Sequence, residues 1–186
     1  YILNVNVITA DALLEDYAVV LKDDRIEEIL PMSRLDVEER NGGDAIIYDG
    51  DGAYLFPGFI DIHSDNIESM VQPRPTSVMD FGIALMEHEK QLVNQGITTI
   101  YHSLSFLKKD GAATNKEARK PEKMQELAEL IKNLPKKDHL IRHRFHCRFD
   151  IRNWEGYEAL MDYLEKDYIH LLSFNDHTPG QGQFRD

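Results

Sequence analysis

The residues of this sequence best suited to chemistry are a histidine and a carboxylate two positions apart. His63 and Asp65 follow the apolar, Pro-Gly-containing run 57–62. Alternate side chains of an extended strand point to one face, so we expect both groups on the same face, roughly 7 Å apart. An imidazole nitrogen and a carboxylate oxygen can both reach one divalent cation from there. The pair therefore predicts a metal site.

The same pattern has an ordinary interpretation. A bare His-x-Asp tripeptide occurs by chance in surface loops or as a hydrogen-bonded pair, and short motifs give many false positives. Here His63 and Asp65 close an apolar strand, and parallel barrels display their chemistry at the carboxyl ends of their strands. This position favours the metal interpretation.

Further polar residues end or follow the other expected strands. Parallel α/β folds place their functional groups at that end. For His102, a buried hydrogen-bonded role is favoured over a functional one, because no motif spacing supports function. The residues that end or follow these strands are His102, Ser103, Asp150, Asp176 and His177.

The strand expected over 140–150 is unusually charged. Alternation places Arg142, Arg144, His146, Arg148 and Asp150 on one face. If this face points into a barrel, its charges need carboxylates, phosphates or water, because an unpaired buried charge is costly. A ligand-binding face and a buried arginine–carboxylate network both remain open for Arg144 and Arg148.

The chain divides into two regions with different patterns of expected strands and helices. Residues 1–53 indicate a small β-rich domain of short strands separated by turns. Residues 54–186 alternate strands and helices, which implies parallel strands joined by crossovers and an α/β fold class. We expect strands at 55–63, 97–101, 140–150 and 168–174, and helices at 80–95, from Pro121 onward and at 154–167.

Composition narrows the function classes. The net charge of −12 argues against sequence-independent nucleic-acid binding. No apolar run approaches the ~20 residues of a membrane span. The single cysteine, Cys147, allows no internal disulfide and fits a reducing cytoplasm. A small anionic substrate remains compatible if metal ions or arginines hold it.

Several segments together resemble a known family. The chain is similar to the amidohydrolase superfamily, and within it to the phosphonate-metabolism hydrolases of the carbon–phosphorus lyase pathway. The resemblance spans the whole chain. It is carried by His63-Ser64-Asp65-Asn66, Pro73-Arg74-Pro75, Gly96-Ile97-Thr98-Thr99, the strand 142–148 and Asp176-His177-Thr178-Pro179-Gly180-Gln181.

This resemblance implies a fold and a reaction. The fold is a small N-terminal β domain followed by the first four βα units of a TIM-like (β/α)8 barrel, since four strands cannot close a barrel of eight. The reaction is hydrolysis of α-D-ribose 1-methylphosphonate 5-triphosphate with release of diphosphate. The cofactor is one or two divalent ions, zinc first, with manganese and iron as alternatives. Such an ion lowers the pKa of bound water from far above neutrality to about 7.

The resemblance also implies roles for individual residues. His63, Asp65, Asp150 and His177 correspond to metal ligands, and Asp65 and His177 to catalytic groups. Most of the superfamily has a second histidine where Asp65 stands, and its harder oxygen can alter metal preference. A glutamate is expected at the position of Asp150. The expected substrate contacts are Asn66, Arg74 and Gln181.

The chain departs from the family in length. Family members are longer, and their later strands supply further histidine ligands and an aspartate. We therefore expect the N-terminal half of a hydrolase, inactive alone, whose exposed sheet edge pairs with a second copy or with the missing C-terminal half. Two alternatives stay open: another amidohydrolase, such as a cyclic amidase or deacylase, and a non-catalytic binding fragment.

Overall fold

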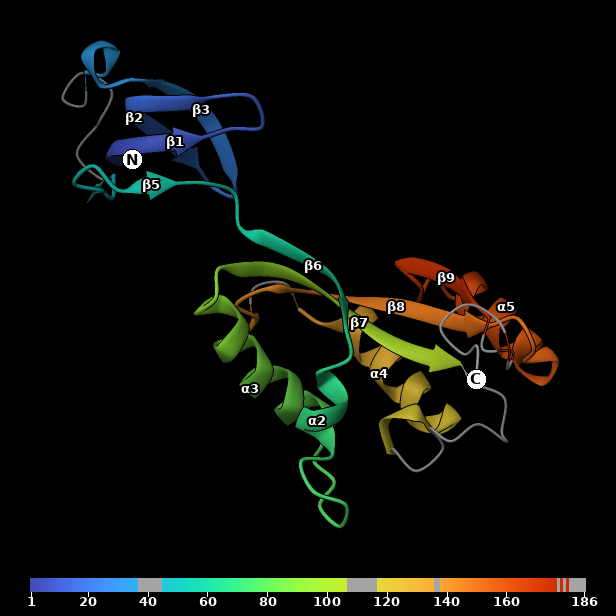
Figure 1. Cartoon of the computed structure of the whole chain (residues 1–186). Helices are drawn as coiled ribbons and strands as arrows, with labels where there is room; N and C mark the ends of the chain where they lie inside the picture. Colours follow the sequence, from blue (N-terminus) through green and yellow to red (C-terminus); the bar gives the residue numbers. More distant parts are fainter. Residues whose placement is uncertain (37–44, 107–116, 136–137, 177, 179, 181–186) are drawn as a thin grey trace. The chain divides into compact units, whose positions relative to one another are not determined.

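The chain forms two structural units, each with its own sheet (Figure 1). The computed structural model describes residues 1–36, 45–106, 117–135, 138–176, 178 and 180. The first unit comprises Tyr1–Pro57 and the second Gly58–Asp186. Within the described residues, no helix is both long enough and apolar enough to cross a membrane.

The first unit is a mixed five-stranded sheet with the order β3-β2-β1-β4, in which β5 also pairs with β1. The hairpins β1–β2 and β2–β3 are antiparallel, and the short strands β4 and β5 run parallel to β1. The strands are β1 Ile2–Ile8, β2 Leu13–Lys22, β3 Arg25–Pro31, β4 Tyr48–Asp49 and β5 Tyr54–Leu55, with a 3-10 turn at Met32–Arg34.

Both faces of this small sheet bury apolar side chains. Val19 packs with Val5 and Val7 on one face, whereas its neighbours Ala18 and Val20 pack on the other. Alternation along β2 produces this division, because successive strand residues point to opposite faces.

The second unit is built on a four-stranded sheet in the order β6-β7-β8-β9. All neighbouring strands are parallel, as the strand–helix alternation predicted. The strands are β6 Phe59–Ser64, β7 Ile97–Phe106, β8 Arg142–Asp150 and β9 Leu171–Asn175. The helices are α2 Ile67–Val71, α3 Phe81–Val93, α4 Pro121–Asn133 and α5 Tyr157–Glu165, with 3-10 turns at Glu117–Arg119 and Trp154–Gly156.

Local sequence signals set the helix boundaries. The Asp80 carboxylate caps α3 by accepting from the N–H of Ile83 at 3.1 Å. Pro121 opens α4 at a position where its missing N–H costs nothing. After α3, Gly96 has a φ of 77°, which lets the chain turn directly into β7.

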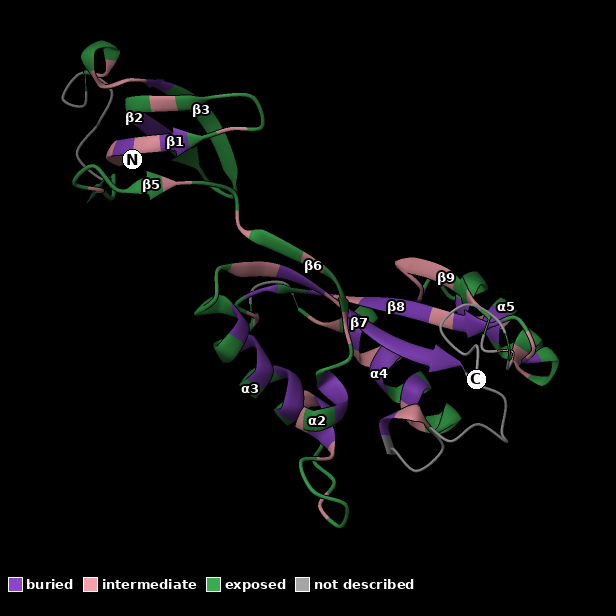
Figure 2. Cartoon of the chain, viewed as in Figure 1, coloured by how far each residue is buried: buried purple, intermediate pink, exposed green. Residues whose placement is uncertain are grey.

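One apolar core joins the helices to a single face of the parallel sheet. It contains side chains from all four helices together with Leu104, Phe106, Phe145, Cys147 and Phe149 of β7 and β8. Figure 2 shows buried residues along β7 and β8 and on the sides of α3 and α4 that face them. The opposite face therefore carries the alternate, mostly polar residues of the strands.

The structure corrects two of the predicted strands. The strand predicted from Leu55 is divided, because Tyr54 and Leu55 pair with β1 in the first unit and β6 begins only at Phe59. The strand predicted to end at Tyr101 runs on to Phe106, so His102 and Ser103 lie inside β7 and not after it. The end of β7 was placed too early because His102 and Ser103 are polar but buried.

Strand β6 has exposed apolar side chains and irregular pairing with its neighbour. Phe59, Ile60 and Ile62 are 53%, 63% and 58% exposed. Its pairing with β7 is irregular: Asp61 pairs with Ile100 but Ser64 pairs with His102, so three steps on β6 match two on β7. This extra residue next to His63 has the character of a β-bulge.

The core position of Phe145 yields a stability prediction. Phe145 is fully buried between the sheet and the helices, so Phe145→Ala should lower the free energy of unfolding by about 3–5 kcal/mol. Phe174→Ala is the matched control, because that side chain is 66% exposed and should cost less than about 1 kcal/mol. Urea titration followed by circular dichroism measures both, and equal losses would contradict the assigned core.

Candidate functional site

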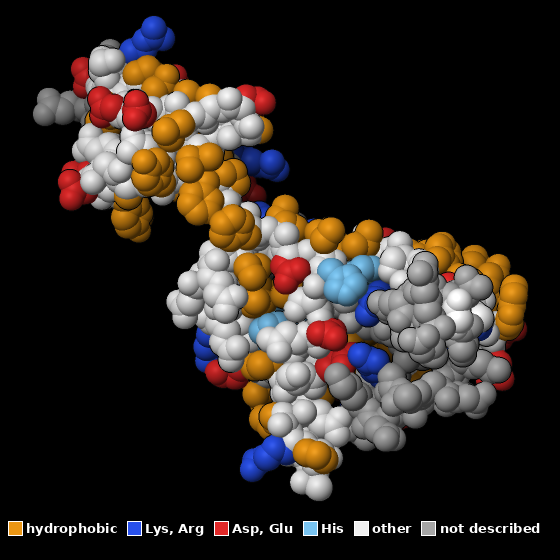
Figure 3. All heavy atoms as spheres, viewed as in Figure 1, with side chains coloured by type: hydrophobic (Ala, Val, Ile, Leu, Met, Phe, Trp, Pro, Cys, Tyr) orange, Lys and Arg blue, Asp and Glu red, His pale blue; other side chains and the backbone are white. Residues whose placement is uncertain are grey.

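His63 lies at the carboxyl end of β6 with an exposed side chain. Its ring meets the ring of His146 edge-on, with 5.4 Å between the ring centroids. Its backbone N–H donates to the Asp61 carboxylate at 3.0 Å, which holds the backbone of the strand end. Figure 3 shows histidine side chains at the surface of this unit beside acidic and basic side chains.

Asp65 follows β6 and is not part of it. The strand ends at Ser64, and the backbone carbonyl of Asp65 accepts from the N–H of Glu68 at the start of α2. Strand alternation therefore gives no information about the direction of the Asp65 side chain, although both His63 and Asp65 are exposed. Their use as metal ligands stays a prediction.

Asp150 ends β8 and is almost fully buried, with 1% of its surface exposed. Its carboxylate accepts from the backbone N–H of Arg152 at 2.9 Å and pairs with the guanidinium of Arg152 at 3.2 Å. A buried carboxylate needs such a partner. A metal ion bound here would therefore share the Asp150 carboxylate with the guanidinium of Arg152.

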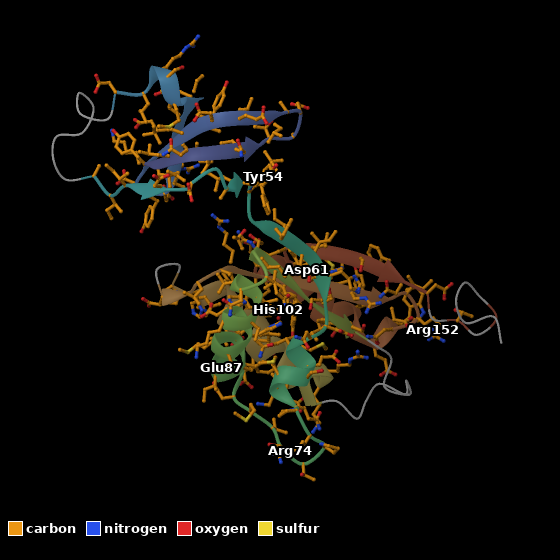
Figure 4. The ribbon with its side chains drawn as sticks, turned by 60° about the vertical axis from the view of Figure 1, so that its left-hand side comes forward. Tyr54, Asp61, Arg74, Glu87, His102 and Arg152 are labelled. Carbon is orange, nitrogen blue, oxygen red and sulfur yellow. The ribbon has the colours of Figure 1, made fainter. Side chains whose placement is uncertain are left out.

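Two of the predicted substrate contacts, Asn66 and Arg74, lie in different surroundings. The Asn66 amide is 3.1 Å from Nε2 of His88 in α3. Arg74 lies in the loop between α2 and α3 and forms a backbone bridge with Ser77. In Figure 4 Arg74 is at the far end of this loop, away from Asp61 and His102.

The last predicted segment is described only in part. His177 and Gln181 lie outside the described residues. The neighbouring Asp176 carboxylate accepts from the hydroxyl and the backbone N–H of Thr178. These bonds, the hydroxyl first, lower the pKa of Asp176.

His146 is the residue of this site that sequence reasoning did not select. It lies in β8, and its ring contacts all three of the other strands of the parallel sheet, β6, β7 and β9. Nδ1 is 3.1 Å from the carbonyl of Ile62 in β6 and 2.8 Å from the hydroxyl of Ser103 in β7. Nε2 is 2.9 Å from the hydroxyl of Ser173 in β9.

These contacts determine the tautomer of His146. A backbone carbonyl only accepts, so Nδ1 carries the proton and donates to Ile62. Nε2 then accepts from the Ser173 hydroxyl. Burial lowers the pKa of His146, which agrees with a neutral ring. The sequence placed His146 on the polar face of its strand, but only strand register brings Ser103 and Ser173 beside it.

A second group of possible metal ligands lies at the other end of the strands. Donor atoms of Glu89, His139 and His143 all lie within 4.8 Å of one another. His139 precedes β8 and His143 is the second residue of that strand, whereas Asp150 is its last. This group was not predicted, because its members come from α3, a loop and β8.

Comparison with known proteins supports the family resemblance. No protein-family model matches the chain. The chain is similar to a curated diphosphatase. It is 28% identical over 138 residues to the alpha-D-ribose 1-methylphosphonate 5-triphosphate diphosphatase of Escherichia coli (strain K12). The match covers 73% of this chain and 35% of that enzyme, so the chain spans about a third of the length of the relative.

The buried histidines predict how stability depends on pH. Burial lowers the pKa of His102, His143 and His146 below the ordinary value of 6.5. Below about pH 6.5 the unfolded chain therefore binds protons that the folded chain does not, and stability falls as the pH falls. Each such proton contributes at most about 1.4 kcal/mol per pH unit.

The variant His146→Asn tests this prediction, because asparagine keeps a donor near the Nδ1 position but does not titrate. Urea midpoints between pH 7.5 and 5.5 should decline less steeply for the variant than for the parent chain. Identical slopes would show that His146 titrates normally in the folded state.

Proposed function

We propose that this chain forms the N-terminal part of a metal-dependent hydrolase that releases diphosphate from α-D-ribose 1-methylphosphonate 5-triphosphate. The proposal rests on the similarity of the chain to a bacterial enzyme that is named for this reaction. The position of His63 at the carboxyl end of a parallel strand supports it, since such folds hold their chemistry there.

Among the described residues, only Glu89, His139 and His143 bring three possible metal-donor atoms within 4.8 Å of one another. We therefore propose the donors at the carboxyl end from their residue types and their place at or after the strand ends. His63 offers an imidazole nitrogen, and Asp65 and Asp150 offer carboxylate oxygens. Nitrogen and oxygen donors of this kind bind zinc and manganese. We assign His177 to the same set on the resemblance alone. When bound, the ion would supply an acidic water and neutralise charge on phosphoryl oxygens.

The chain's own residues position these donors. His146 donates to the carbonyl of Ile62, the residue before His63, and so fixes the strand end that carries the imidazole. Arg152 holds the Asp150 carboxylate at the end of β8. The first contact fixes backbone and the second orients the Asp150 carboxylate, and supporting residues tune a metal site by such contacts.

An anionic substrate requires positive charge in a chain of net charge −12. Arg144 and Arg148 share the polar face of β8 with His146, because they occupy alternate positions. Guanidinium groups bind phosphate with paired hydrogen bonds. We propose these two arginines, together with Asn66, Arg74 and Gln181, as the source of substrate contacts.

The four parallel strands fit the first half of a TIM-like barrel. Their spatial order follows the chain and one face is covered by helices, as in such a barrel. In this proposal the exposed edge of β6 meets strands contributed by the rest of the enzyme or by a second copy. The ligands still needed would come from there.

Removing the charge of Asp65 should reduce activity. In the complete gene product that carries this chain, Asp65→Asn should lower kcat/KM for diphosphate release by about a hundredfold or more, because metal-assisted charge stabilisation supplies several kcal/mol. Asp24→Asn is the matched control, an exposed carboxylate in a turn of the first unit. Diphosphate is measured by a coupled phosphate assay. Equal rates for both variants would remove Asp65 from the mechanism.

Metal removal should abolish the same activity. Dialysis of the complete gene product against a chelator should stop diphosphate release, and added zinc or manganese should restore it, because water without an ion has a pKa far above neutrality. Metal content is followed by mass spectrometry. Full activity in a metal-free sample would refute the metal-dependent mechanism.

A further inference from the structure

A compact group of metal donors lies between α3 and the amino end of β8, away from the proposed active site. We propose that Glu89, His139 and His143 bind a structural divalent ion, zinc by its donor set. The His143 and Asp150 positions in β8 are separated by about 23 Å at the usual rise per residue. This site is therefore separate from the proposed hydrolase centre and does not depend on that function.

The distances in the cluster suit a tetrahedral ion. Oε2 of Glu89 is 3.2 Å from Nδ1 of His139 and 3.2 Å from Nε2 of His143. Ligands about 2.0–2.1 Å from zinc at tetrahedral angles stand about 3.3 Å apart. Charge-assisted hydrogen bonds are shorter, about 2.7–2.9 Å. The spacing therefore matches the edges of a coordination tetrahedron better than it matches two such bonds.

The Glu89 carboxylate is buried, and a buried carboxylate is stable only beside a positively charged or hydrogen-bonding partner. The side chains of Glu89, His139 and His143 are only 5%, 12% and 0% exposed. The N–H of Leu140 donates to Oε2 of Glu89 at 3.1 Å. Nε2 of His143 faces Oε2 of Glu89, and a neutral imidazole there can offer its lone pair to an ion. A cation is the partner that satisfies both a buried carboxylate and neutral imidazoles.

A supporting histidine completes the arrangement. Nδ1 of His143 is 2.9 Å from Nε2 of His102, and the two rings stack 5.2 Å apart at 9°. With Nε2 of His143 on the ion, Nδ1 carries the proton and donates to His102. Metal-bound histidines nearly always donate their second N–H in this way.

The ion would join three segments that are separate in the sequence. Glu89 belongs to α3, His139 to the loop before β8, and His143 to β8. A water or the second oxygen of Glu89 would occupy the fourth position. Because a folded chain binds the ion and an unfolded chain does not hold this geometry, zinc binding should stabilise the fold.

The test uses the 186-residue chain with His63→Ala, which removes a proposed ligand of the other site. After chelator treatment, ZnCl2 is titrated by calorimetry and by thermal unfolding. We expect about one zinc per chain and a melting temperature that rises with zinc concentration. Co²⁺ in place of zinc should give the visible bands of a tetrahedral site.

Two variants on the same helix decide the assignment. Glu89→Gln keeps an acceptor for Leu140 but loses the charge, and should weaken zinc binding by about a hundredfold or more. Glu87→Gln is the matched control, because Glu87 is an exposed carboxylate two residues away that pairs with Lys90, and it should bind zinc like its parent.

The remaining outcomes are equally decisive. If Glu89→Gln proves unfolded by circular dichroism, His139→Ala replaces it, because that side chain lies at the edge of the cluster. Failure of the His63→Ala chain to bind zinc, or unchanged binding in Glu89→Gln or His139→Ala, would overturn the proposal and leave a purely hydrogen-bonded cluster.

Discussion

The polar face of the second unit depends on one imidazole. His146 contacts the backbone of β6 and the hydroxyls of Ser103 and Ser173, and so joins all four parallel strands. Backbone pairing already connects neighbouring strands, and this side chain also links β6 to β9 in a single network. Because β6 has a neighbour on one side only among the described residues, its carboxyl end, where His63 lies, relies on this contact.

Much of the architecture was predictable from the sequence, for clear physical reasons. The parallel strands and α3, α4 and α5 were expected close to their observed ranges, because their apolar residues recur with strand and helix periods. The end of β7 was missed, since His102 and Ser103 are polar yet buried. Periodicity detects apolar faces and cannot recognise a buried polar pair whose partners come from other strands.

The site was less predictable than the fold. A tripeptide pattern located His63, and a resemblance to known hydrolases supported the choice, but no local pattern indicates His146 or Glu89. Both depend on register: His146 meets Ser103 across the β7–β8 pairing, and Glu89 meets His143 across the helix–sheet interface. Such contacts between distant segments exist only after folding.

The two ends of the parallel sheet use histidine differently. At the carboxyl ends, His63 is exposed beside the neutral, hydrogen-bonded His146. At the amino ends, His102 and His143 stack within the interior and face a carboxylate of α3. One sheet thus carries exposed histidine at one end and buried histidine at the other, and parallel α/β folds commonly place function at the carboxyl ends and stability at the amino ends.

The irregular pairing of β6 has a consequence for evolution. Because one additional residue is accommodated between Asp61 and Ser64, the aim of the His63 imidazole is set by a local kink and not by the general pleat. Loss of that residue would shift the register of the strand end against β7, while leaving every residue type of the motif in place. Descendants of this gene could therefore lose the orientation of the His63 side chain through a change of spacing that a search for residue identities would overlook.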